Sequence, residues 1–130
     1  MIKDEASQAG EKASLTPAVF HILLALADGE RHGHGIMQEI ALRTDGTIRL
    51  GPGTLYRSIK RLLAEGLIEE CDERPDPALD DERRRYYRLT GAGRRAAKAE
   101  AWRLGRLVDM ARAKRVIGTR FPRAQTGGMR

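Results

Sequence analysis

Residues 50–70 carry the sequence LGPGTLYRSIKRLLAEGLIEE. Gly51 followed by Pro52 favours a helix start, because proline already has a helical φ and the first turn needs no donor from it. Apolar residues then recur at spacings of four, three and one and form a single stripe, which consists of Leu55, Ile59, Leu62 and Leu63. Gly66 suits the left-handed position that ends many helices. The segment therefore predicts a short amphipathic helix, whose outer face carries Tyr56, Arg57, Lys60 and Arg61.

A β-hairpin is predicted after this helix. Residues 67–71 are typical of a short strand, and residues 83–89, RRRYYRL, are typical of a strand that returns beside it. The loop between them, DERPDPALDDE, contains two prolines and so cannot be the interior of a helix. Alternation along the second strand places Arg85, Tyr87 and Leu89 on one face. The returning strand thus begins with three consecutive arginines.

Two further helices precede the basic helix, and a long helix follows the hairpin. Thr16 and Pro17 favour the start of a helix that runs to about Ala27 and is apolar nearly all round. A second helix is expected over residues 36–44, and Thr90 is the expected cap of a long helix over residues 91–117. This order predicts a mainly α fold with a small β-hairpin wing. Such a fold is a winged helix-turn-helix, here with a long C-terminal helix, whose expected role in dimerisation rests on the residue pattern and the resemblance described below.

The size and composition of the chain suit one small domain. It has 130 residues and a formal net charge of +6, which favours polyanionic partners. We expect a disordered N-terminal arm (1–14), a winged helix-turn-helix DNA-binding domain (15–90), the dimerisation helix (91–117) and a flexible basic tail (118–130). The single cysteine excludes an intramolecular disulfide and fits a reducing cytoplasm. No segment approaches the roughly 18 apolar residues of a membrane span, so no membrane partner is expected.

The basic helix suits the major groove of double-stranded DNA, which is about 12 Å wide and admits one α-helix. Its apolar stripe would anchor it to the domain, while the side chains of Tyr56, Arg57, Lys60 and Arg61 would reach phosphates and base edges. Arg83, Arg84 and Arg85 would contact flanking phosphates or a minor groove. Two plainer interpretations stay open. The helix could be an ordinary surface helix, and the arginines could offset the acidic loop before them.

Six motifs occur in order along the chain: LTP at 15–17, ILLAL at 22–26, HGHGI at 32–36, GTLY at 53–56, EGLI at 65–68 and RRYYRLTGAG at 84–93. Together they resemble the PadR family of bacterial winged-helix transcriptional regulators, over about residues 15–110. The resemblance implies a homodimer that is held largely by the C-terminal helix. It also implies repression of a nearby gene, relieved by a small molecule. The single C-terminal helix is similar to the short branch of that family.

The resemblance extends the predicted DNA-binding set. Thr54 belongs to the GTLY motif, and His34 stands where the family usually has tyrosine. A histidine there could contact a phosphate in a pH-dependent way, or it could be a tolerated polar substitution. The full predicted set is His34, Thr54, Tyr56, Arg57, Lys60, Arg61, Arg83, Arg84 and Arg85. The expected target is a double-stranded DNA operator that is an imperfect palindrome, because a symmetric dimer reads two half-sites.

The long C-terminal helix carries a predicted dimer seam. Small and apolar residues repeat along it at steps of four, three, four and three, and these residues are Ala97, Ala101, Leu104, Val108 and Ala111. Trp102, the only tryptophan, lies one position from the seam. Its indole could stack on a small, flat aromatic effector, or it could simply pack within the dimer interface.

Catalytic, metal and cofactor sites are not expected. His32 and His34 lack the further converging ligands that a metal site needs, and the GPG of residues 51–53 lacks the lysine of a phosphate-binding loop. We therefore predict a sequence-specific DNA-binding transcriptional regulator, a repressor relieved by a small molecule and not an enzyme. It would work in the cytoplasm, on the bacterial nucleoid. The alternative is a winged-helix module for protein contact, without sequence-specific DNA binding.

Overall fold

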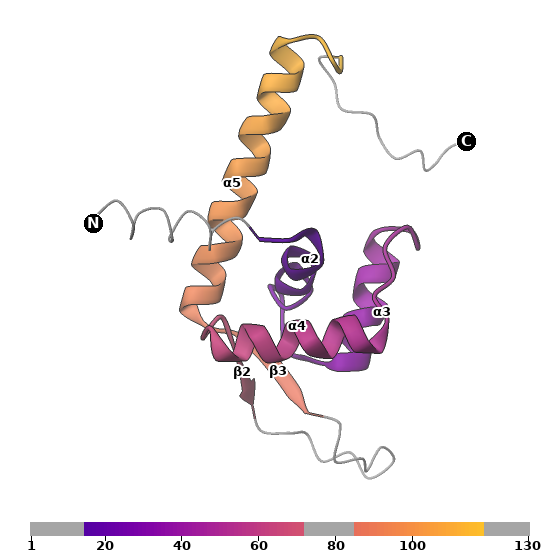
Figure 1. Ribbon diagram of the computed structural model, residues 1–130, viewed down its shortest axis with the longest axis vertical. Helices are drawn as coiled ribbons and strands as arrows, with labels where there is room; N and C mark the ends of the chain where they lie inside the picture. Colours follow the sequence, from indigo (N-terminus) through magenta and orange to yellow (C-terminus); the bar gives the residue numbers. More distant parts are fainter. Residues whose placement is uncertain (1–14, 72–84, 119–130) are drawn as a thin grey trace. The chain divides into compact units, whose positions relative to one another are not determined.

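The computed structural model describes residues 15–71 and 85–118 (Figure 1). Its helices are α2 (Pro17–Ala25), α3 (Gly33–Arg43), α4 (Pro52–Ala64) and α5 (Gly91–Ala113), and its strands are β1 (Arg31–His32), β2 (Ile68–Cys71) and β3 (Tyr86–Leu89). The predicted mainly α fold with a small β wing is confirmed. The predicted N-terminal arm, the acidic loop, Arg83, Arg84 and nearly all of the basic tail lie outside the described residues.

The hydrophobic core lies in the first of two compact units, Met1–Glu100 and Ala101–Arg130. Three helices and the sheet contribute to it, and its buried members are Val19, Ile22, Leu23, Ala25, Leu26, Ile36, Ile40, Leu55, Ile59, Leu62, Ile68 and Tyr87. Helix α2 is less enclosed than its composition predicts, because its Leu24 is 46% exposed. Over the described ranges, no helix combines the length and apolar character that crossing a bilayer requires.

The sheet has one strand more than the predicted hairpin. Its order is β1-β3-β2, so the returning strand β3 lies in the centre with an antiparallel partner on each side. Arg31 pairs with Tyr87 and His32 with Tyr86 on one side, while Ile68 pairs with Leu89 on the other. Strand β1 was not predicted, because a segment of two polar residues is too short to show the alternation that identifies a strand.

Helix α3 begins at Gly33, earlier than the predicted start at Ile36. The cause is His32, whose ring Nδ1 accepts a hydrogen bond from the backbone N–H of Gly35 at 3.0 Å. This bond satisfies one of the N–H groups that a helix start leaves without a partner. Histidine is not among the usual capping residues, so the sequence pattern alone did not indicate this start.

Helix α5 is fastened to the turn between α4 and β2. The Thr90 hydroxyl donates to the carbonyl of Gly66 at 2.7 Å and accepts from the N–H of Gly93 at 3.0 Å, as the predicted cap should. The Thr90 backbone N–H donates to the carbonyl of Leu67 at 3.1 Å. A Cβ at Gly93 would overlap that same carbonyl. The absence of a side chain at residue 93 therefore allows the first turn of α5 to lie against the turn.

Helix α5 ends at Ala113 and not at the predicted residue 117. Arg115 takes a left-handed conformation with a φ of 62°, which interrupts the helical backbone. The N–H of Val116 then donates to the carbonyl of Ala111 at 2.8 Å. This bond satisfies a carbonyl at the helix end, in the manner usually supplied by a glycine.

Candidate nucleic-acid interface

Helix α4 presents most of the predicted DNA-binding residues on one exposed face. Its Leu55, Ile59 and Leu62 are buried, so the opposite face points away from the core. That opposite face carries Thr54, Tyr56, Arg57, Lys60 and Arg61, all exposed. Arg61 donates from Nε to the Glu65 carboxylate at 3.1 Å, one turn along the helix. An exposed pair of this kind contributes at most about 1 kcal/mol, so a phosphate can compete for the guanidinium.

The side chain of Tyr56 reaches the start of helix α3. A Cβ at Gly33 would overlap the Tyr56 hydroxyl, so the phenol fits there only because residue 33 is glycine. The start of a helix carries partial positive charge and N–H groups without helical partners. Tyr56 thus places a hydroxyl donor at the positive end of α3, and the residue as a whole remains 42% exposed. Sequence reasoning placed Tyr56 on the outer face but missed this contact, because only packing brings α3 and α4 together.

His32 and His34 lie beside this junction. The two rings are nearly parallel, with centroids 6.3 Å apart, and the His34 side chain is exposed. The His32 ring also meets Tyr86 edge to face at 5.4 Å. His32 therefore joins the start of α3 to strand β3 through both its ring and its backbone pairing. The structure brings His34, the predicted phosphate contact, to the same helix end as the Tyr56 hydroxyl.

Glutamates of strand β2 contact one arginine just before strand β3 and one within it. Arg85, the one member of the predicted arginine cluster that the structure describes, lies with Nε 3.4 Å from the Glu70 carboxylate. Arg88, which was not in the predicted set, donates from Nε to Glu69 at 2.7 Å. The acidic loop that could offset these arginines lies outside the described residues. Both observed pairs are exposed, so they leave the guanidinium groups accessible to phosphate.

The predicted dimer seam is distributed over both compact units. Ala97, in the first unit, packs against that unit's own core. In the second unit Ala101 is exposed, whereas Leu104, Val108 and Ala111 are half-buried. Trp102 is 66% exposed, and Leu107 and Met110 are also exposed. The second unit thus leaves several large apolar side chains uncovered, which is typical of a surface that binds a partner.

A metal centre has no support in residues 15–71 and 85–118. No group of three or more His, Cys, Asp or Glu side chains within these ranges is arranged to hold a metal ion. His32 Nδ1 already accepts the N–H of Gly35, so that atom has a structural role.

Comparison with known proteins gives consistent results. Residues 22–99 match the model of the Transcriptional regulator PadR-like family. The chain is 36% identical over 107 residues to the transcriptional regulator Rv3488 of Mycobacterium tuberculosis, covering 82% of this chain and 89% of that protein. It is 38% identical over 86 residues to a 37.1 kDa protein of transposon TN4556 from Streptomyces fradiae, covering 66% of this chain but only 22% of that protein.

A solved structure has the same fold. A transcriptional regulator from Clostridium thermocellum superposes with a TM-score of 0.59 at 30% identity, over 76% of this chain and 92% of that one. The family match spans more than half of the sequence and includes the second half of α2, helices α3 and α4, the sheet and the start of α5. The chain therefore belongs to the PadR-like family of transcriptional regulators.

Proposed function

We propose that this protein binds an operator in double-stranded DNA and represses transcription from it. Helix α4 would enter the major groove, with Arg57, Lys60 and Arg61 directed at base edges. The start of α3 would lie against the phosphate backbone, where the Tyr56 hydroxyl and His34 would contact one phosphate. The arginines of the wing, Arg83 to Arg85, would reach flanking phosphates.

One observation carries this proposal. The exposed face of α4 is polar and basic, and the Tyr56 hydroxyl is held at the positive end of α3. A groove-reading helix needs base-directed donors on its outer face and phosphate-directed donors at its flank, because base contacts give specificity and phosphate contacts fix the position. A helix that bound another protein would instead expose apolar side chains.

A homodimer would present two α4 helices to the DNA. We propose that the uncovered apolar residues of α5 form its interface, around the seam of Ala101, Leu104, Val108 and Ala111. A two-fold dimer reads two inverted half-sites about one helical turn apart, or a multiple of it. The operator should therefore be an imperfect palindrome, and the protein would act in the cytoplasm, on the DNA of the nucleoid.

Selection of bound duplexes from a random DNA pool tests the proposal. We expect the selected sequences to converge on one imperfect palindrome. Lys60→Ala or Arg61→Ala should then weaken binding to that sequence by roughly 1–3 kcal/mol and relax the base preference at the contacted position. Fluorescence anisotropy with the selected duplex and with single-base variants measures both effects.

Lys98→Ala is the matched control, because Lys98 is an exposed cation of α5 outside the proposed interface. It should change affinity much less than Lys60→Ala and leave base preference intact. A pool without an enriched sequence, together with equal effects of Lys60→Ala and Lys98→Ala, would favour the protein-contact module instead.

A small, flat aromatic effector would bind at Trp102 in the dimer. The indole is exposed in the single chain and offers a planar apolar surface for stacking. A ligand there would change DNA binding only if its affinity differed between the DNA-competent and incompetent dimers. Titration with flat aromatic compounds should quench Trp102 fluorescence as operator DNA is released. Release without a change in emission would place the effector elsewhere.

A further inference from the structure

Helix α3 begins with a turn that depends on its cap. Residues 33–35 are Gly-His-Gly, and glycine is a poor helix former because its backbone loses the most freedom on folding. The first turn of α3 also contains no acidic residue, so no carboxylate there offsets the partial positive charge of the helix start. The bond from the Gly35 N–H to His32 Nδ1, at 3.0 Å, is therefore important for the order of this turn.

His32 differs from the other side-chain caps of the described helices in the chemistry of its acceptor. At the start of α2 the Thr16 hydroxyl accepts from the N–H of Val19, and at the start of α5 the Thr90 hydroxyl accepts from the N–H of Gly93. A hydroxyl oxygen accepts without regard to pH near neutrality. An imidazole nitrogen accepts only while it is unprotonated, and an ordinary imidazole titrates between pH 5 and 8.

Protonation of the His32 ring would remove the cap. In the neutral ring Nδ1 is the acceptor, so the ring proton is on Nε2. A second proton would bind Nδ1 and turn it into a donor that faces the N–H of Gly35. The same proton would place a full positive charge at the positive end of α3. Both effects disfavour the first turn, so they act in the same direction.

The groups around His32 cannot replace the lost acceptor. The titratable and charged groups of the neighbouring elements are Arg31 in β1, His34 in α3, Tyr56 in α4, Cys71 in β2 and Tyr86 in β3. Carboxylates nearby contact arginines: Asp28 and Glu39 contact Arg31, Glu30 and Glu69 contact Arg88, and Glu70 contacts Arg85. A carboxylate would favour the imidazolium, but it could not restore an acceptor at Nδ1.

The start of α3 supports two parts of the candidate interface. The Tyr56 hydroxyl fits against Gly33, the first residue of the helix. His32 pairs through its backbone with Tyr86 of the central strand β3, and its ring lies against the same tyrosine. A change in the first turn of α3 would therefore reach both the Tyr56 hydroxyl on α4 and the wing.

We propose that His32 makes the start of α3 a pH-sensitive switch. With a neutral ring the first turn is capped and holds the Tyr56 hydroxyl, and with a protonated ring the turn opens. The stability that the cap supplies is present while the ring is neutral. It is lost as the pH falls below about 6.5, where an imidazole of the unfolded chain gains its proton. The switch is a property of the protein alone, whereas its effect on operator affinity rests on the proposed function.

Backbone NMR of the full-length chain between pH 7.5 and 5.5 tests the switch. The amide proton of Gly35 should shift upfield or broaden as its bond to Nδ1 is lost, whereas the capped amides of Val19 and Gly93 should not follow it. His32→Asn should make the Gly35 amide insensitive to pH, because an asparagine oxygen caps a helix without titrating in this range. An unchanged Gly35 amide in the natural chain would overturn the proposal.

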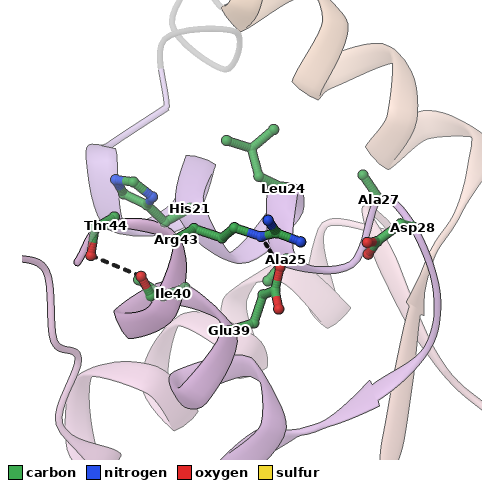
Figure 2. A pocket seen from close by; sticks show the side chains of 9 residues that line it. All are labelled: His21, Leu24, Ala25, Ala27, Asp28, Glu39, Ile40, Arg43 and Thr44. Carbon is green, nitrogen blue, oxygen red and sulfur yellow. Dashed lines mark hydrogen bonds and ion pairs between the residues drawn. The ribbon is translucent and has the colours of Figure 1, made fainter. Parts of the chain in front are cut away.

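The two other histidines of the chain provide matched controls. His34→Gln removes the neighbouring imidazole, and the Gly35 response should persist. His21 lines a cavity of about 500 Å³ between α2 and α3 together with Thr44, the residue at which α3 ends (Figure 2). His21→Gln should therefore also leave the response unchanged. Loss of the response in His34→Gln would assign the titration to His34 and overturn the proposal.

Denaturation with urea over the same pH range gives an independent measure. The ratio of folded to unfolded chain should fall at least about threefold more in the natural chain than in His32→Asn, since a helix cap contributes on this order. Equal decreases in the two proteins would overturn the proposal. If His32→Asn folds poorly, the Gly35 amide in the natural chain and in His34→Gln still decides between the outcomes.

The effect on DNA is tested with the selected operator duplex in the His34→Gln chain, because an imidazolium at residue 34 would attract phosphate and oppose the effect. Affinity should fall several-fold from pH 7.5 to 5.5, and adding His32→Asn should remove most of that fall. A fall of equal size in both chains would overturn the link between the cap and DNA binding. A chain whose Gly35 amide responds as expected but which binds no DNA would contradict the proposed function and leave the switch established.

Discussion

At the scale of single residues, the position of Tyr56 depends on the missing side chain at Gly33. A Cβ there would overlap the Tyr56 hydroxyl. We expect Gly33→Ala to displace the phenol and to weaken operator binding, while the free energy of unfolding falls by at most about 1 kcal/mol, because the methyl group meets only the end of a partly exposed side chain that can move away. Chemical denaturation and fluorescence anisotropy measure the two effects.

Gly35→Ala is the matched control for this prediction. It adds the same methyl group two residues along α3, where the nearest atom is a His32 ring carbon at an ordinary 3.5 Å. Tyr56→Ala should relieve the overlap, so the double variant Gly33→Ala with Tyr56→Ala should show coupling in a double-mutant cycle. Equal operator affinity of Gly33→Ala and Gly35→Ala would contradict this account of the junction.

Tyr87, in the central strand, should make stability sensitive to alkaline pH. Burial raises the pKa of its phenol, nearby Glu70 and Tyr56 add to the shift, and Arg85 opposes it. The folded chain therefore holds this proton to higher pH than the unfolded chain, in which the pKa of the phenol is about 10. The resulting stability is fully present below pH 10 and is lost as the pH rises through the folded-state pKa.

Denaturation curves from pH 8 to 11 measure this loss, and Tyr87→Phe is the control because it keeps the ring and removes the titrating group. The natural chain should lose more unfolding free energy over that interval than Tyr87→Phe. Parallel decreases in both proteins would show that other groups are responsible.

Individual residues of the interface were predictable to different degrees. The exposure of Lys60 and the burial of Leu55 follow from helical periodicity, which depends only on sequence spacing. The pairing of Arg85 with Glu70 depends on the register of β2 and β3, which cannot be read from the pattern of either strand alone because the long loop between them does not indicate how they align. His32 as a helix cap was missed because imidazole rarely has this role.

At the scale of elements, the attachment of α5 depends on Gly93. A Cβ there would overlap the backbone carbonyl of Leu67, which cannot move without disturbing the turn. We expect Gly93→Ala to lower the free energy of unfolding by about 1–3 kcal/mol, although alanine is the better helix former. Thermal and chemical denaturation measure the change.

Gly105→Ala tests the same substitution in the same helix without the contact. No atom lies within 4 Å of the Cβ that it would add. The change should raise stability, or leave it unaffected, because alanine favours a helix over glycine by about 0.5–1 kcal/mol. If both substitutions were neutral, the close contact between α5 and the α4–β2 turn would contribute nothing to the free energy of unfolding.

The elements that were predicted are those long enough to show a period. Helix α4 has several turns of apolar stripe with a proline at its start, and its predicted limits agree with the observed ones. Strand β1 has two residues and is defined by its partner Tyr87 and not by its own pattern. The end of α5 depends on the left-handed Arg115, a conformation that few sequence signals indicate for a non-glycine residue.

At the scale of the whole molecule, the apolar residues of the second unit predict self-association. Val108 lies in the proposed seam, and light scattering at micromolar concentration should detect a dimer of the natural chain. Val108→Glu should convert it into a monomer, because a carboxylate buried in an apolar interface without a partner is strongly unfavourable.

Lys114→Glu is the control. It also adds a carboxylate to the second compact unit, but Lys114 is exposed and lies outside the seam. It should leave the dimer intact. A natural chain that remains monomeric throughout this concentration range would exclude the proposed assembly, and with it an operator read by two symmetric α4 helices.

Family membership also agrees with the absence of a predicted catalytic site. Members of the PadR-like family are transcriptional regulators, so the prediction that the chain is not an enzyme is confirmed. That conclusion required the ordered motifs of the whole chain, because the basic helix alone fits many surfaces. The cavity between α2 and α3 could not be predicted, since it depends on how two helices pack and not on the pattern of either one.

The central place of β3 has a consequence for the order in which the chain is built. Both β1 and β2 are synthesised before β3, yet each has β3 as its partner in the sheet. While the chain is still emerging from the ribosome, helices α2, α3 and α4 can associate, but neither outer strand can pair. Closing the long loop from Arg31 to Tyr87 costs entropy that local contacts do not. The sheet should therefore be completed only after α2, α3 and α4 have associated, so a nascent chain released before residue 90 would lack the wing.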